Sequence, residues 1–253
     1  IGESNSEYEA LRKLKAISKK NQIYSNFIGM GYYGTYTPYV ILRNILENPG
    51  WYTSYTPYQP EVAQGRLEML LNFQQSIIDL TGMDIANASL LDEATATAEA
   101  VGLSQRLDKT NSKKIFISSN CNPQTIDLIK TRTNPFGLEL IIGDEKKELS
   151  KINEDIICGV LSYPGTLGEI NDPSESISQI HKKNGKAILV CDLLALARLK
   201  TPAELGADIA VGSAQRFGIP MGYGGPHAAF FATKEEFKRS MPGRIIGVSK
   251  DRH

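Results

Sequence analysis

The sequence predicts an α/β fold with three αβα layers and a mostly parallel sheet. Beyond residue 85, short apolar runs alternate with helical segments, which is typical of a parallel sheet covered by helices on both faces. The chain has 253 residues, 41% of them hydrophobic, so it can bury a substantial core. The predicted strands are 115–118, 138–142, 156–162, 187–192, 209–212 and 228–232.

The region before residue 85 has a different character. Apolar residues recur every three positions over 6–20, which predicts an amphipathic helix. Residues 27–60 are rich in glycine, proline and tyrosine and contain Trp51, the single tryptophan. Within them, Thr37 followed by Pro38 predicts a helix N-cap with proline at the first helical position. A long helix is predicted over 61–80.

Composition and charge exclude several classes of function. Lys plus Arg and Asp plus Glu both number 28, so no net positive charge favours nucleic acid or an anionic membrane. Neither a membrane-spanning run nor a signal peptide is apparent. Cys121, Cys158 and Cys191 are widely spaced, which indicates neither a disulfide framework nor a zinc site and fits an intracellular compartment.

The chain begins with Ile1 and stops soon after an apolar segment, so we expect a fragment of a longer polypeptide. We interpret residues 1–253 as one domain fragment in three parts. These are an amphipathic helix over 1–22, a Gly/Tyr/Pro-rich segment over 23–65, and a doubly wound αβα domain over 66–253. The charged run 144–155 is interpreted as a solvated connection.

Gly29, Gly31 and Gly34 match the G-x-G-x-x-G pattern of dinucleotide sites. That pattern binds pyrophosphate only between a strand and the N-terminus of a helix. Here it follows an amphipathic helix and leads into Thr35, so we predict no nucleotide site.

Ligands of doubly wound sheets bind beyond the carboxyl ends of the strands. Asp192 closes one apolar run and could hold the protonated ring nitrogen of pyridoxal phosphate, or it could simply cap the following segment. Such an enzyme needs a Schiff-base lysine past a later strand, where this sequence has Gln215 and Arg216. Lys200 lies too early in the chain to be a comfortable substitute.

The expected phosphate site also departs from the usual chemistry. A phosphate cup is built of small residues at a helix N-terminus, but this helix opens with Asp92 and Glu93. Two carboxylates would repel a phosphate, so we expect them to cap the helix. We interpret His227 as a structural histidine and regard Cys121 as a poor nucleophile.

Most of the chain resembles the N-terminal half of the glycine cleavage system P-protein, the glycine dehydrogenase (decarboxylating) family. The resemblance rests on five stretches, FIGMGYYGTYTPYVILRNILENPGWYTSYTPYQPEVAQGR from Phe27, DLTGMDIANASLLDEATATAEA from Asp79, SYPGTLGEI from Ser162, DLLALARLKTPAELGADIAVGSAQRFGIPMGYGGPHAAFFA from Asp192 and MPGRIIGV from Met241.

The resemblance implies the large domain of fold type I pyridoxal phosphate enzymes. In this family only the second half carries the Schiff-base lysine, whose position corresponds to Gln215 here. The ring-stacking histidine corresponds to Asn122 or a near neighbour, and Asp192 is retained as a relic of cofactor binding or as a structural acid. The resemblance therefore implies no catalytic residue and no bound cofactor or metal in this fragment alone.

The implied enzyme is an oxidoreductase of glycine catabolism that decarboxylates glycine on pyridoxal 5'-phosphate and passes the aminomethyl group to the lipoyl arm of H-protein. The implied partners are H-protein and the C-terminal half or β subunit, in a homo- or hetero-oligomer. Our candidates for contacts to glycine, cofactor or lipoyl arm are Tyr32, Tyr33, Tyr36, Tyr55 and Arg66.

Two alternatives stay open. The tyrosine segment could simply pack against the second half, making the chain a non-catalytic pairing and docking module. An independent pyridoxal enzyme using Lys200 is a further reading. We expect a bacterial cytoplasmic location, with the mitochondrial matrix as the alternative.

Overall fold

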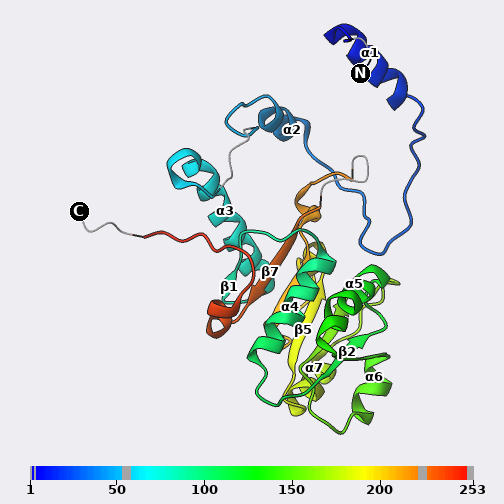
Figure 1. Ribbon diagram of the computed structural model, residues 1–253, viewed down its shortest axis with the longest axis vertical. Coiled ribbons are helices and arrows are strands. Elements are labelled where there is room, and N and C mark those ends of the chain that lie inside the picture. The colour runs from blue at the N-terminus through cyan, green and yellow to red at the C-terminus, as the bar shows by residue number, and fades with distance from the viewer. Residues whose placement is uncertain (1, 3, 53–57, 222–226, 250–253) are drawn as a thin grey trace.

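A seven-stranded sheet forms the centre of the molecule, with the strand order β1-β7-β6-β5-β4-β2-β3 (Figure 1). The structure is a computed structural model and describes residues 2, 4–52, 58–221 and 227–249. The strands are β1 (Ile85–Ala86), β2 (Lys114–Ser118), β3 (Glu139–Gly143), β4 (Cys158–Tyr163), β5 (Lys186–Cys191), β6 (Ile209–Ser213) and β7 (Ala229–Thr233).

The sheet is mostly parallel. Strands β2 to β6 pair in parallel, whereas β7 is antiparallel to both β6 and β1. Because side chains alternate across a strand, each strand contributes to both faces. Phe116 belongs to one buried cluster, while Ile115 and Ile117 belong to the other.

Helices cover both faces and complete the three layers. Helix α3 (Pro60–Thr81) and α7 (Ser174–Lys182) supply Ile77 and Ile180 to one cluster. Helix α4 (Glu93–Leu107) and α5 (Pro123–Thr133) supply Leu103 and Ile129 to the other. The remaining elements are short: α6 (Glu145–Glu148), α8 (Leu193–Leu196) and the 3₁₀ turns η1 (Asn134–Phe136), η2 (Leu149–Lys151), η3 (Gln215–Phe217) and η5 (Glu235–Ser240).

The two N-terminal helices lie apart from these layers. Helix α1 (Glu7–Ser18) begins with a capping box between Ser6 and Glu9, and α2 (Tyr39–Leu46) follows an extended segment. No described residue of either helix is buried. Figure 1 shows α1 in dark blue at the far end of that segment, well away from the sheet.

The fold class predicted from the sequence is confirmed, and each predicted strand overlaps an observed one. The predicted cap at Thr37 is wrong, because α2 has Pro38 at its N-cap with no side-chain cap hydrogen bond, and the Thr37 hydroxyl donates to the Gly218 carbonyl. The two-residue strand β1 was not predicted, since so short a run has no periodicity. No helix in the described part of the chain is long and apolar enough to cross a membrane.

Candidate functional site

The candidate site lies at the carboxyl edge of the parallel strands. Strand β2 pairs with β4, β4 with β5, and β5 with β6, all in parallel, so the residues that follow these strands meet at one edge. The residues at or just beyond these strand ends are Asn120–Pro123, Tyr163–Thr166, Asp192 and Ser213–Arg216. The N-terminus of α4 and the turn at 29–34 border the same edge, since their residues line the same cavities.

Asp192 and Arg216 form a two-point ion pair at this edge. The Arg216 Nε and Nη2 atoms each lie 2.9 Å from a different Asp192 carboxylate oxygen. The ring of Tyr33 covers the guanidinium, with its centroid 4.2 Å from Arg216 Cζ. Asp192 also accepts a hydrogen bond from the Leu194 backbone and caps α8. Both carboxylate oxygens of Asp192 are therefore engaged by the protein itself.

Glu93 is the second acid of the site. Its Oε1 accepts a 2.9 Å hydrogen bond from Asn122 Nδ2, and Asn122 Oδ1 accepts one from the Thr166 hydroxyl at 2.9 Å. The sequence predicted that both carboxylates cap α4: Asp92 does so by accepting from the Thr95 backbone at 2.7 Å, whereas Glu93 bonds to Asn122 instead. The first turn of α4 is therefore occupied by carboxylates.

Burial raises the pKa of Glu93 above its ordinary range. The negative charges of Asp192 and Asp92 add to this rise, while the hydrogen bonds from Asn122 and the Ser213 backbone oppose it. Glu93 keeps some accessible surface, yet protein atoms enclose its carboxyl group closely enough for desolvation to dominate. An additional anion would meet repulsion here.

Two small cavities remain between the turn at 29–34 and the sheet edge. One, of about 60 Å³, is lined by Tyr32, Asp92, Glu93 and Gln215 among others. The other, of about 20 Å³, is lined by Tyr33, Glu93, Asp192, Gln215 and Arg216 among others. Pockets for cofactor-sized ligands measure roughly 300–1,000 Å³, and a water needs roughly 10–15 Å³. These cavities have room for a few water molecules.

The residues present do not fit pyridoxal phosphate. Gln215, at the position predicted for the Schiff-base lysine, is buried and carries an amide that forms no such bond. The α4 N-terminus presents Asp92 and Glu93 where a phosphate would need free backbone N–H groups. The ion pair with Arg216 engages the carboxylate of Asp192.

The predicted contact residues are only partly gathered. Tyr32 and Tyr33 lie at the two cavities, with Tyr32 packed edge-on against His227. Tyr36 is 75% exposed, and Arg66 lies half-buried on α3 and lines neither cavity. Tyr55 falls outside the described residues.

Other candidates for chemistry lack a reactive environment. Burial raises the pKa of the Cys121 and Cys191 thiols, which disfavours the thiolate nucleophile. Lys200 is exposed beyond α8 and lines neither cavity. Among the residues that the structure describes, no group of three or more His, Cys, Asp or Glu side chains could hold a metal ion.

Residues 1–253 match the family described as "Glycine cleavage system P-protein". The chain belongs to the glycine cleavage system P-protein family. It is 81% identical to a glycine dehydrogenase (decarboxylating) from Pelagibacter ubique and 58% identical to one from Stutzerimonas stutzeri. The alignments cover 100% and 97% of this chain but 26% and 25% of those proteins, so the chain spans about a quarter of their length, at the N-terminal end.

Solved structures agree with the family assignment. A crystal structure of glycine decarboxylase (P-protein) in inhibitor-bound form superposes with a TM-score of 0.90 and 34% identity, covering 100% of this chain and 58% of that one. A sphingosine-1-phosphate lyase from Burkholderia pseudomallei gives a TM-score of 0.73 over 95% of this chain and 61% of that one. With only 12% identity, that second likeness concerns the fold alone.

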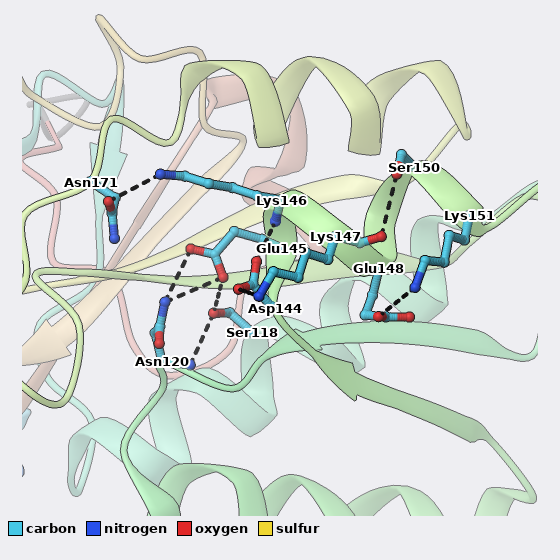
Figure 2. Close-up of polar contacts among 10 residues, drawn as sticks. All are labelled: Ser118, Asn120, Asp144, Glu145, Lys146, Lys147, Glu148, Ser150, Lys151 and Asn171. Atoms are coloured by element: carbon cyan, nitrogen blue, oxygen red, sulfur yellow. Dashed lines mark hydrogen bonds and ion pairs between the residues drawn. The ribbon is translucent and has the colours of Figure 1, made fainter.

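A separate polar cluster surrounds Glu145 of this P-protein chain. Glu145 accepts hydrogen bonds from the Ser118 hydroxyl at 2.5 Å and from Asn120 Nδ2, as Figure 2 shows. Lys146 on the same short helix binds Asn171. The cluster ties α6 to the end of β2, so part of the charged run 144–155 is structured rather than a plain solvated connection.

Sequence reasoning assigned Arg216 no role beyond occupying the wrong position for a lysine. Its ion pair with Asp192 follows from the two positions in the sequence once the neighbouring strands are known. Asp192 directly follows β5, Arg216 lies three residues beyond β6, and these strands are parallel neighbours. Opposite charges just past adjacent parallel strands are placed at the same edge of the sheet.

Proposed function

We propose that this chain is the N-terminal part of an enzyme that decarboxylates glycine on pyridoxal 5'-phosphate and passes the aminomethyl group to the lipoyl arm of H-protein. The 81% identity over the full chain to a protein named glycine dehydrogenase (decarboxylating) is the observation that carries this proposal. The bacterial sources of the relatives support a bacterial cytoplasmic location.

The cofactor belongs, in this proposal, to the remainder of the enzyme. Pyridoxal phosphate supplies an electron sink for the carbanion left when the carboxyl group departs. Gln215 and the acidic α4 terminus of this chain supply neither a lysine nor an anion site. The remainder could be the C-terminal half of one polypeptide or a separate β subunit. Both arrangements are compatible with the relatives. This chain covers 58% of the solved P-protein chain but 26% of the Pelagibacter protein, so the solved chain is less than half as long as the Pelagibacter protein.

The N-terminal region of this chain contributes the interface with that remainder. Leu11 and Leu14 of α1 are 55% and 62% exposed, and every apolar residue of α2 is exposed. Apolar faces of this kind are usually buried against a partner. In this proposal, helix 1–22 and segment 23–65 contact the partner, and domain 66–253 is the folded support that carries them.

The tyrosine segment is the proposed place where this chain approaches the substrates. Phenol hydroxyls donate hydrogen bonds to carboxylates, and Tyr36 has most of its surface available. Tyr32, Tyr33, Tyr55 and Arg66 complete the proposed set. Because Tyr33 packs on Arg216 within the chain, Tyr36 is the sharper probe of a direct contact.

The test is steady-state kinetics of the full-length enzyme with Tyr36→Phe. A lost hydrogen bond to a charged group costs about 1.5–3 kcal/mol, so kcat/KM for glycine or for H-protein is expected to fall about 10- to 100-fold. Tyr24→Phe, which changes a tyrosine that is 76% exposed and lies outside the proposed contact set, is the matched control. Unchanged kinetics in both variants would remove the polar role of Tyr36.

A second candidate function is a non-catalytic pairing and docking module. The exposed apolar faces of α1 and α2 favour it, since they offer contact area and no reactive group. It predicts that changes in these helices weaken assembly with the remainder of the enzyme or binding of H-protein, while Tyr36→Phe leaves turnover of the assembled enzyme intact.

A further inference from the structure

The turn that carries the glycine pattern is fastened to the sheet edge by the stacking of Tyr33 on the Arg216–Asp192 ion pair. Tyr33 lies on the Arg216 guanidinium, and Arg216 is held by two 2.9 Å hydrogen bonds to Asp192. The side chains of Arg216 and Asp192 are 21% and 23% exposed, so the pair is only partly solvated. A planar guanidinium can bind a carboxylate at its edge and an aromatic ring on its face at the same time.

We propose that Asp192, Arg216 and Tyr33 form a clamp that closes the ligand cleft of this sheet and holds residues 29–37 upon it. In doubly wound folds this cleft, beyond the carboxyl ends of the strands, is where a ligand binds. Here the clamp and the turn occupy that position, and the cavities left beneath them measure about 60 and 20 Å³. The cleft has become an anchoring site for the chain's own N-terminal segment.

Contacts on other elements hold the same segment. Gln124 on α5 donates to the Met30 carbonyl at 2.6 Å. The Thr35 hydroxyl donates to the Ile219 carbonyl at 2.9 Å, and the Thr37 hydroxyl donates to Gly218. The segment is therefore attached at both ends, with the Tyr33 stack between them.

The backbone of the turn also indicates an imposed conformation. Met30 has φ of 52°, in a region that residues with a side chain rarely adopt, and it lies between Gly29 and Gly31 at φ of 67° and 87°. Such backbone costs free energy and persists where surrounding contacts determine it. The Tyr32 N–H, which donates to the Gly29 carbonyl at 2.9 Å, closes the turn, and the contacts of Tyr33 and Gln124 hold it at the sheet edge.

The clamp sets the direction in which the N-terminal region leaves the sheet. Tyr36 lies near the end of the clamped residues and α2 follows them, and both are exposed. The inference that Tyr36 and α2 face the remainder of the enzyme rests on the proposed function. The clamp itself is independent of the proposed function, because it is formed wholly within this chain.

The experiment is hydrogen exchange with mass spectrometry on the full-length protein, comparing Tyr33→Ala, Tyr33→Phe and Arg216→Ala. Peptides covering residues 27–37 are expected to exchange at least about tenfold faster in Tyr33→Ala and Arg216→Ala, because each removes the stack. Tyr33→Phe keeps the ring and is expected to exchange like the wild type. Arg198→Ala, at an exposed arginine beyond α8, is the charge-matched control.

Amides of β5 and β6 serve as the internal reference, so a variant that unfolds is recognised by their loss of protection. Arg216→Lys keeps the charge but loses the two-point geometry, and it is expected to loosen 27–37 as well. Unchanged exchange of 27–37 in Tyr33→Ala and Arg216→Lys, with β5 and β6 protected, would overturn the clamp. Loosened exchange with normal glycine turnover would retain the clamp and count against its role in the proposed function.

Discussion

The sheet region, residues 58–249, and the N-terminal region, residues 2–52, differ in what their apolar side chains contact. In the described part of the sheet region, both faces of the strands are packed into clusters that contain fully buried Phe116, Phe230 and Phe231. In the N-terminal region, the apolar residues of α1 and α2 are exposed, and the turn at 29–37 is fastened at the sheet edge. The first region is stabilised by its own core, whereas the second is held to the chain at the turn, and we propose that the remainder of the protein covers the exposed apolar residues of α1 and α2.

The largest expected effect is in the sheet region, at Gly212 of β6. A Cβ at this position would lie 2.1 Å from the Cys191 carbonyl oxygen and 2.8 Å from the Phe230 ring. Because backbone of the paired strand cannot move aside, we expect Gly212→Ala to lower the free energy of unfolding by about 3 kcal/mol. Thermal unfolding of the full-length protein measures it.

The control for Gly212→Ala is Gly102→Ala in the interior of α4. A Cβ there meets only the end of the Arg106 side chain, at 3.5 Å. Removing a helical glycine is expected to raise stability by about 0.5–1 kcal/mol. Equal destabilisation by both substitutions would contradict the close packing assigned to β6.

A smaller effect is expected at Asp208, at the opposite end of the sheet from the clamp. Burial alone would raise the pKa of Asp208, but hydrogen bonds from His181, Lys234 and the Ala187 backbone outweigh it and lower the pKa to about 2. The ionised carboxylate therefore stabilises the folded state at neutral pH. Asp208→Asn is expected to cost about 2 kcal/mol there.

The lowered pKa of Asp208 also predicts how the stability depends on pH. A carboxyl whose pKa is lowered on folding contributes fully above its ordinary value of 3.8, and this contribution is lost as the pH falls towards about 2. The stability difference between wild type and Asp208→Asn should therefore shrink over that interval, as monitored by unfolding at a series of pH values. A constant difference down to pH 2 would show that the substitution acts through packing instead.

The smallest effect on folding, and the one that separates the regions, is expected from the double substitution Leu11→Ser with Leu14→Ser in α1. Both leucines are more than half exposed, so exchange protection of the sheet should change by no more than about 0.5 kcal/mol. Association with the remainder of the enzyme, measured by gel filtration or by turnover, should weaken. Arg12→Ser on the same helix is the control, and loss of sheet protection in the leucine variant would remove the distinction between the regions.

Sequence pattern predicted the sheet region well because periodicity and strand length are local properties. The runs ending near Ser118, Cys191 and Ser213 each became a strand, and Asp92 caps α4 as expected. The contacts at the carboxyl edge of the sheet were harder to predict, because the Asp192–Arg216 pair joins residues 24 positions apart and depends on which strands are neighbours. Thr37 failed as a cap because a tertiary partner, the Gly218 carbonyl, took its hydroxyl.

In the N-terminal region the helices were predicted from the sequence, but their position relative to the sheet was not. The three-residue apolar spacing gave α1, yet nothing in that spacing says which surface the stripe contacts. The tyrosines were recognised as a group, while the stacking of Tyr33 on Arg216 requires the fold. Patterns within one helix or strand can be recognised in the sequence, whereas pairings between distant elements can be predicted only when the order of the strands is known.

The most direct test of the account is borohydride reduction of the full-length holoenzyme, followed by peptide mapping of the pyridoxyl adduct. We expect a single modified lysine outside residues 1–253, because Gln215 occupies the lysine position here and the clamp closes the cleft. A stoichiometric adduct on a lysine within these residues, Lys200 for example, would contradict it and make this sheet edge a cofactor site.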